Sequence, residues 1–334
     1  MCNYPKVNYI GNKEKIADWI INNLPIKDGT VLDLFSGGAS VSYALKKSGF
    51  KVLSNDVLYS NYCISRALIE NQNDKLELNF CGNDIPAYYS ERGYNKIKWM
   101  SNKVYFDYEI KELSSLIEYS NNLKKDDKYI FLALLRRAMI RKLPYSRMNI
   151  KWEQIIKLRD EEFSYKKYKR RRAYHNKSFL FHIKDNLKEY NYAVFNNGKE
   201  NKAYQKDAFN MIYDLDQSLD LIYIDPPYPS TMNNYRDFYG GFDIIFNKQI
   251  EYTDFTDRLN FIDNINKIIK IAKCKTKFIA ISLNNTSNPS YNEIINSIKN
   301  IVNNIWVYKK DHIYQITGKE NKNINYEILI ILEV

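Results

Sequence analysis

Short apolar runs along this chain alternate with longer segments in which apolar residues recur every three or four positions. An unbroken apolar run is typical of a buried strand, and the wider spacing is typical of a helix with one buried face. The runs predict strands at 31–35, 51–54, 219–224, 277–283, 305–309 and 325–332. Helical spacing covers 16–24, 41–45, 209–215, 255–269 and 293–302. Strands that alternate with helices predict an α/β fold.

The stretch from about 85 to 195 departs from this alternation. Its clearest element is a helix predicted over 129–142, which has one apolar stripe and also carries arginines and a lysine. There are no internal repeats. We therefore predict one α/β core formed by 1–84 and 196–334, and a mainly helical, basic insertion formed by 85–195.

The most informative motif is Asp225-Pro226-Pro227-Tyr228, directly after the strand predicted at 219–224. Two prolines end the strand because they cannot continue its hydrogen-bond ladder. A carboxylate is thereby fixed at the carboxyl end of a strand, where open α/β sheets bind ligands. With the flat ring of Tyr228 beside it, the motif predicts a planar slot that suits an aromatic amine. A strand end with an ordinary turn is the simpler interpretation.

A second set of candidates follows the strand at 31–35. Ser36-Gly37-Gly38 opens a helix, and glycines there let backbone amides approach a ligand. Asp56 comes 18 residues after Gly38, at the end of the next strand, where an acid contacts ribose hydroxyls in nucleoside-binding folds. A helix cap would also explain Asp56. The glycines do not form G-x-G-x-x-G, so a dinucleotide site is not indicated.

Three further segments carry polar candidates. Lys13 lies where a loop enters a helix, and it would add a cation to an anion-holding helix start. Asp207 follows a short strand end at 203–206. The polar, aromatic segment 230–241 has no apolar period, so we predict a mobile loop at the site. A solvated lysine and a crossover without a role are the simpler interpretations of Lys13 and of the loop.

Charge indicates the class of partner. Lysines and arginines number 50 against 39 acids, a net charge of +11. Six of the seven residues at 166–172 are basic, with tyrosines interleaved, which favours contact with a nucleic-acid backbone over a membrane. A solvated face remains the alternative. Four scattered cysteines and three histidines do not indicate a metal site or disulfides. Without an apolar run of about 18 residues, we expect a soluble cytoplasmic protein.

Taken together, these segments resemble the DNA adenine-N6 methyltransferases with the Dam-like, α-type order of motifs. The resemblance is carried by YIGNK (9–13), DLFSGG (33–38), ND (55–56), KDA (206–208) and DPPYPSTMNNY (225–235). It implies a Rossmann-like methyltransferase domain, with a doubly wound mixed sheet, formed by 1–84 and 196–334. It also implies that 85–195 is the target-recognition insertion.

The resemblance implies S-adenosylmethionine as cofactor and a role for each matched residue. Tyr9 and Lys13 would line the methionine end, and Asp33 through Gly37 would hold the amino-acid part. Asp56 would bind the ribose, and Asp207 would meet the adenine amino group. The expected cofactor residues are therefore Tyr9, Lys13, Asp33, Phe35, Ser36, Gly37, Asp56 and Asp207. Ser36-Gly37-Gly38 replaces the commoner Gly-x-Gly, which leaves the amide contacts of that turn open.

The implied reaction is methyl transfer to adenine N6, with Asp225, Pro226 and Tyr228 as the catalytic residues. Asp225 and the Pro226 carbonyl would accept the two amino hydrogens, and Tyr228 would stack on the base. No metal is needed. A base inside a duplex must flip out, at a cost of a few kcal/mol. The expected contacts to double-stranded DNA are Arg136, Arg141, Arg147, Lys169, Arg170, Arg171, Arg172, Asn234 and Tyr235.

The sequence leaves alternatives open. An RNA adenine or DNA cytosine-N4 methyltransferase would use the same chemistry, although the leading Asp of the tetrapeptide and the large basic insertion favour adenine in DNA. A non-catalytic nucleic-acid-binding module belongs to a different class, and an NAD-dependent dehydrogenase would require the missing glycine motif. The DNA recognition sequence, a partner restriction endonuclease and the oligomeric state do not follow from these residues.

Overall fold

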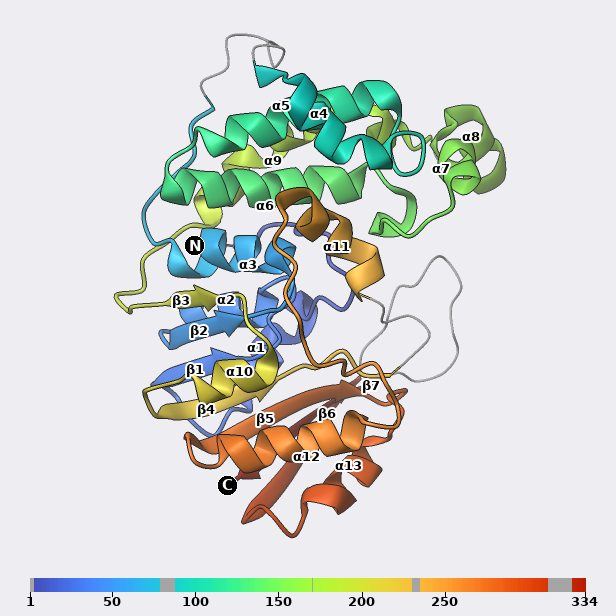
Figure 1. The fold of residues 1–334 in the computed structure, drawn as a ribbon. Coiled ribbons are helices and arrows are strands. Elements are labelled where there is room, and N and C mark those ends of the chain that lie inside the picture. The colour runs from blue at the N-terminus through green and yellow to red at the C-terminus, as the bar shows by residue number, and fades with distance from the viewer. Residues whose placement is uncertain (1–2, 79–87, 170, 230–234, 312–325) are drawn as a thin grey trace. The chain divides into compact units, whose positions relative to one another are not determined.

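The computed structural model describes residues 3–78, 88–169, 171–229, 235–311 and 326–334 (Figure 1). The chain divides into two compact units. We call the first the sheet unit, which comprises Lys13–Val57, Asn197–Asn234 and Ile250–Val334. We call the second the helical unit, which comprises Met1–Asn12, Leu58–Asn196 and Tyr235–Gln249.

The sheet unit is built on a mixed sheet with the strand order β3-β2-β1-β4-β5-β7-β6. All strands from β3 to β5 pair in parallel, while β7 is antiparallel to both β5 and β6. Its strands are β1 (Thr30–Asp33), β2 (Lys51–Asn55), β3 (Lys202–Tyr204), β4 (Leu219–Ile224), β5 (Thr276–Asn284), β6 (Asn304–Asp311) and β7 (Tyr326–Glu333). Its helices are η1 (Glu14–Ile16), α1 (Ala17–Asn22), α2 (Ser40–Lys47), α10 (Ala208–Tyr213), α12 (Phe261–Ala272) and α13 (Tyr291–Ile298).

The central strands read as continuous apolar runs because helices cover both of their faces. On one face α10, α12 and α13 pack over alternate residues of β1, β4, β5 and β7 (Figure 1). On the other face α2 packs over β1 and β2. From β1 the chain adds β2 and β3 on one side, and β4 and β5 then continue on the other side. This doubly wound, Rossmann-like arrangement confirms the predicted fold class.

The helical unit buries apolar stripes between helices. The long α6 packs against α3, α5 and α9. Its helices are α3 (Tyr59–Ser65), which continues into a short π-helix (Arg66–Glu70), α4 (Glu91–Ile97), η4 (Lys98–Met100), α5 (Asp107–Asn121), α6 (Lys125–Arg141), η5 (Pro144–Ser146), α7 (Trp152–Arg159), α8 (Glu161–Tyr168), η6 (Ala173–Asn176), α9 (Phe179–Ala193) and α11 (Tyr235–Phe246). In the part of the chain that the structure describes, no helix is long and apolar enough to cross a membrane.

Two local predictions are wrong. The segment 235–241, which we predicted as part of a loop over 230–241, belongs to the helix α11, while 230–234 lie outside the described residues. Tyr235, Phe238, Tyr239 and Phe242 do recur at helical spacing, but the Gly240-Gly241 pair hides the pattern. Gly241 packs closely on Met148, since a Cβ there would lie 2.6 Å from the sulfur and would displace that side chain. The other correction concerns 255–259, which precede α12 instead of opening it.

Candidate active site

The predicted catalytic motif lies where the winding of the sheet reverses. β1 and β4 are neighbours, with Asp33 paired in register with Tyr223. Asp33 is the last residue of β1, and Asp225 directly follows β4. A crevice forms at such a reversal because the connections leave in opposite directions, and ligands of open α/β sheets bind there. The two acids that the sequence singled out therefore lie at the same carboxyl edge.

Asp225 is held by a buried ammonium. Lys13 Nζ lies 3.5 Å from Asp225 Oδ1 and 3.1 Å from Oε2 of Glu327, which is on β7. Both Lys13 and Glu327 are buried, whereas the Asp225 side chain keeps 19% of its surface exposed. One cation thus lies between two carboxylates, and only Asp225 faces open space.

The protonation of this group follows from burial and charge. Burial raises the pKa of Asp225 to about 6, because Lys13 offsets only part of the desolvation and Glu327 adds repulsion. Burial alone would lower the pKa of Lys13, but Asp225 and Glu327 outweigh it, so the pKa of Lys13 lies well above its usual value. At neutral pH the site therefore presents an ionised Asp225 beside a charged Lys13.

Asp33 presents an unused acceptor. Its Oδ2 accepts a 2.6 Å hydrogen bond from the Ser42 hydroxyl, and its buried Oδ1 has no hydrogen-bond partner among the described residues. Burial, together with the nearby charges of Asp225 and Asp56, raises the pKa of Asp33 to about 7. A buried acceptor without a partner is costly, so this oxygen suits a ligand that brings a donor or a positive charge.

The turn after β1 has two residues with positive φ angles. Gly37 has a φ of 51°, and its amide donates to Asp56 Oδ2 at 2.8 Å. Ala39, which precedes α2, has a φ of 63°, a left-handed conformation that costs on the order of 1 kcal/mol for a residue with a Cβ. Strain of this kind is common at binding sites. The turn therefore links the two strand ends that carry Asp33 and Asp56.

Asp207 lies at the start of a helix and not in an open loop. Its Oδ1 accepts from the amides of Phe209 and Asn210, which caps α10, and its Oδ2 accepts from Thr253 at 2.8 Å. Each carboxylate oxygen has two acceptor sites. Oδ2 therefore retains capacity for one further donor.

Tyr228 completes the slot. Its hydroxyl accepts a hydrogen bond from the side-chain amide of Asn284, the last residue of β5. The ring is partly buried against the core of the sheet unit, and this burial raises the pKa of the hydroxyl to about 12. The tyrosine is therefore neutral, and its hydroxyl is bound by a residue of the neighbouring strand β5.

The charge balance of this edge defines what it can bind. The carboxylates of Asp56, Asp225 and Glu327, together with Asp33, which is ionised only in part at neutral pH, outnumber the ammonium of Lys13. Such a site favours a ligand with positive charge, although the whole chain is basic. Within the described residues no group of three or more metal-ligating side chains is found.

Comparison with known proteins identifies the chemistry. Residues 9–288 match the model of the family described as D12 class N6 adenine-specific DNA methyltransferase. The chain belongs to this family. The type II methyltransferase M2.HphI of Haemophilus parahaemolyticus is 42% identical over 336 residues, which cover 99% of this chain and 98% of that protein. The type II methyltransferase M.FokI of Planomicrobium okeanokoites is 28% identical over 240 residues, 67% of this chain and 33% of that protein.

In this methyltransferase the predicted residues Tyr9 and Tyr235 belong to the helical unit. The two rings stack with centroids 5.5 Å apart, and Tyr9 also stacks on Tyr239 of α11. Arg136 is buried, donates to the carbonyls of Val7 and Asn8, and lies over the Tyr239 ring. Because its side chain is 1% exposed, Arg136 is not among the residues that we propose to contact DNA.

Other predicted DNA contacts are accessible in the helical unit. Lys169 and Arg171 are exposed, and Arg172 is half-buried. Arg171 lies over Tyr165, and Arg172 over Tyr168, with guanidinium-to-ring distances of 5.4 and 5.0 Å. Arg141 lies over Tyr174 and Arg147 over Phe238, and both are half-buried. Arg170 and Asn234 lie outside the described residues.

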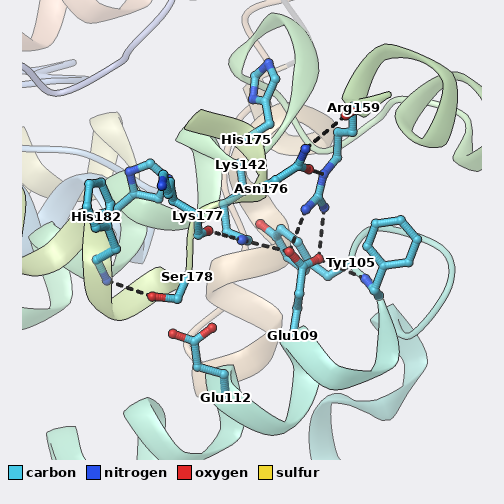
Figure 2. A network of polar contacts seen from close by, with 12 residues as sticks. Tyr105, Glu109, Glu112, Lys142, Arg159, His175, Asn176, Lys177, Ser178 and His182 are labelled. Atoms are coloured by element: carbon cyan, nitrogen blue, oxygen red, sulfur yellow. Dashed lines mark hydrogen bonds and ion pairs between the residues drawn. The ribbon is translucent and has the colours of Figure 1, made fainter. Parts of the chain in front are cut away.

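Two more cations of the basic insertion serve a buried cluster, shown in Figure 2. Arg159 binds Glu109 with two hydrogen bonds of 2.7 and 2.9 Å, and Lys142 Nζ lies 2.7 Å from Glu109 Oε1. Lys142 also donates to the Lys177 carbonyl, and Arg159 Nε donates to Asn176. These contacts join α5, α6, α7 and η6. Lys142 and Arg159 are therefore buried ion-pair partners of Glu109 that connect helices of the unit.

The histidines of the same region are uncharged at neutral pH. Burial lowers the pKa of both His175 and His182 to about 4. His175 Nδ1 donates to the Arg141 carbonyl, and His182 Nε2 donates to the Tyr174 carbonyl. They add no positive charge to the candidate DNA surface at neutral pH.

Sequence reasoning missed Glu327. It is the second residue of the apolar segment Tyr326–Glu333, whose next five residues are leucines and isoleucines. A charged residue next to a buried run, on a strand that neighbours the one after the catalytic motif, was the available signal.

Proposed function

We propose that the protein transfers a methyl group from S-adenosylmethionine to N6 of an adenine flipped out of double-stranded DNA. The observation that carries the proposal is the partly exposed Asp225 carboxylate, held by Lys13 at the switch point of the sheet and followed in the chain by Pro226 and Tyr228. Asp225, Pro226 and Tyr228 are the proposed catalytic residues. Membership of the family supplies the base and the atom that is methylated.

The sheet unit fits the proposed cofactor by charge. S-adenosylmethionine supplies a methyl group on a sulfonium and carries an α-ammonium group. Asp33, with its unpaired buried oxygen, suits the ammonium group, and Phe35, Ser36 and Gly37 form the turn beside it. Asp56 would accept from the ribose hydroxyls, and Asp207 would use its spare acceptor site for an adenine amino group. We propose that Lys13 and Tyr9 complete this set.

The slot around Asp225 makes the amine of adenine reactive. That amine is a poor nucleophile because its lone pair is conjugated with the ring. Asp225 and the Pro226 carbonyl would each accept one of its hydrogens, which favours a pyramidal nitrogen and frees the lone pair. Tyr228, fixed by Asn284, would hold the base by stacking. Positioning and electrostatics therefore carry the catalysis.

The helical unit is the proposed partner of the DNA backbone. We propose that 85–195 acts as a target-recognition domain and that 1–84 and 196–334 form the catalytic domain. Arg141, Arg147, Lys169, Arg170, Arg171 and Arg172 would contact phosphates. The type II relatives support a cognate restriction endonuclease as partner. A DNA substrate also supports a cytoplasmic location.

Nucleoside analysis tests the proposal. The purified protein is incubated with methyl-tritiated S-adenosylmethionine and either duplex DNA or RNA of matched sequence, and the labelled nucleosides are separated. We expect N6-methyldeoxyadenosine from DNA and no label in RNA. Label in N4-methyldeoxycytidine, or in RNA at an equal rate, would contradict the proposal. Sequencing that detects modified bases in the methylated DNA then gives the target site.

A further inference from the structure

Glu327 is a buried carboxylate in a position where an apolar residue would cost less. It is 1% exposed and precedes five leucines and isoleucines on β7. Burying an ion pair seldom stabilises a fold more than apolar residues of the same size do. A functional reason for the charge is therefore worth seeking.

The contacts of Glu327 lead to the catalytic motif. Lys13 Nζ lies 3.1 and 3.3 Å from its two oxygens, closer than the 3.5 Å that separates Nζ from Asp225. Glu327 is also the register partner of Asn284, the residue that donates to the Tyr228 hydroxyl. The register pair Asn284–Glu327 of β5 and β7 therefore acts on both side chains of the motif. Glu327 binds Lys13, which pairs with Asp225, and Asn284 binds the Tyr228 hydroxyl.

We propose that Glu327 is a positioning residue for methyl transfer: it fixes the Lys13 ammonium against Asp225 and so sets the orientation and charge of the carboxylate that receives the amine. The inference rests on the proposed role of Asp225. Glu327 itself does not touch the substrate. It acts on Asp225 by holding Lys13 in place and by its own negative charge, and this distinguishes it from a residue that only supports the strand.

The two neighbours of Asp225 act on its charge in opposite directions. Lys13 favours the ionised carboxylate, and Glu327 opposes it. Asp33, Tyr223 and Tyr228 also interact electrostatically with Asp225 and stay in place in the variants below. Removing the Lys13 charge therefore raises the pKa of Asp225, and removing the Glu327 charge lowers it.

The pH dependence of kcat/KM tests the inference. We compare the wild type with Lys13→Met, Glu327→Gln and Glu333→Gln, a control in which a surface carboxylate on the same strand is neutralised. The acid limb should move to higher pH in Lys13→Met and to lower pH in Glu327→Gln, and it should not move in Glu333→Gln. Activity at neutral pH should fall at least tenfold in Lys13→Met and less in Glu327→Gln, which keeps the Lys13–Asp225 pair.

Two further measurements separate positioning from folding. Calorimetric affinity for S-adenosylhomocysteine and the thermal unfolding midpoint are recorded for every variant. The double variant Lys13→Met/Glu327→Met replaces the pair with apolar groups and should fold, with an acid limb between those of the single variants. An acid limb in Glu327→Gln that coincides with the control, or moves upward, overturns the inference. A wild type that forms no N6-methyladenine overturns the proposed function instead.

Discussion

In the sheet unit the ammonium of Lys13 lies between two carboxylates, whereas in the helical unit the carboxylate of Glu109 lies between an ammonium and a guanidinium. The clusters also differ in access. The Glu109 side chain is 1% exposed and both of its oxygens are bound, while Asp225 keeps 19% of its side chain exposed.

This difference separates a binding site from a structural cluster. Glu109 has a lowered pKa in spite of its burial, because Arg159 and Lys142 stabilise its charge. Asp225 and Asp33 have raised pKa values and lack full compensation. Buried charges that lack full compensation at the carboxyl end of a strand indicate a binding site. Compensated charges between helices indicate a structural contact.

Removing the charge of Glu109 should have the largest effect on stability. Glu109→Gln leaves Lys142 and Arg159 buried without a carboxylate, and we expect a loss of about 3–5 kcal/mol in the free energy of unfolding. Chemical denaturation measures it. The control Glu153→Gln removes an exposed charge from α7 and should stay within about 0.5 kcal/mol of the wild type. Equal stability of the two variants would mean that the cluster does not hold the unit.

Removing the charge of Asp33 should change the free energy of unfolding in the opposite direction. The folded-state pKa of Asp33 is raised to about 7, so the folded state binds a proton that the unfolded state releases near pH 4. Stability from this group is complete below pH 4 and is lost as the pH rises through 7. Asp33→Asn should therefore be more stable than the wild type at pH 8, by up to about 4 kcal/mol, and equal to it near pH 4.

The same substitution should weaken cofactor binding, since the neutral amide no longer attracts a positive charge. Thermal unfolding across pH and calorimetry with S-adenosylmethionine measure the two effects. Ser42→Ala serves as a control that removes the hydrogen bond to Oδ2 but keeps the charge. A variant that is less stable than the wild type at pH 8, or that binds the cofactor equally well, would contradict the assignment.

A pair of substitutions at Tyr228 tests the stacking wall. Tyr228→Phe keeps the ring and loses only the bond from Asn284, worth about 0.5–1.5 kcal/mol. Tyr228→Ala removes the ring, and stacking on a base is worth about 1–3 kcal/mol. In kcat/KM we expect a few-fold loss for Phe and up to about a hundredfold loss for Ala. Equal losses would show that the hydroxyl, and not the ring, matters.

The smallest expected effect concerns three accessible cations of the helical unit, of which Lys169 and Arg171 are exposed and Arg172 is half-buried. Replacing Lys169, Arg171 and Arg172 with glutamine should weaken binding to every DNA sequence. It should also flatten the dependence of log K on log salt by about 0.9 for each phosphate that the protein no longer neutralises. A matched control replaces three exposed lysines of the sheet unit, Lys270, Lys273 and Lys299. An unchanged slope in the first variant would place these residues away from the phosphates.

The sheet unit could be predicted largely from the sequence because its information is local. Apolar runs mark the strands, and the turns that follow them carry Asp33 and Asp225, so the order of the strands alone brings these acids to one edge. The contact of Glu327 with the site could not be predicted, because its partner Lys13 is 314 positions away along the chain. No local pattern links the two.

The helical unit was harder to predict because the sequence does not show whether a basic residue is exposed or buried. Lys142 and Arg159 resemble Lys169 and Arg171 in sequence, yet the first two are bound to Glu109, which lies 50 positions from Arg159. The helix α11 was missed for a related reason. Its Gly240-Gly241 pair lowers helix propensity, and the close packing of Gly241 on Met148 is visible only in the fold.

The central claim is that Asp225 accepts a hydrogen bond from the amine of the substrate and does not bind the cofactor. The most direct measurement combines methyl transfer by Asp225→Ala with its calorimetric affinity for S-adenosylmethionine. We predict that methyl transfer falls at least about a hundredfold while the affinity stays within a few-fold of the wild type. Methyl transfer close to that of the wild type would contradict the account.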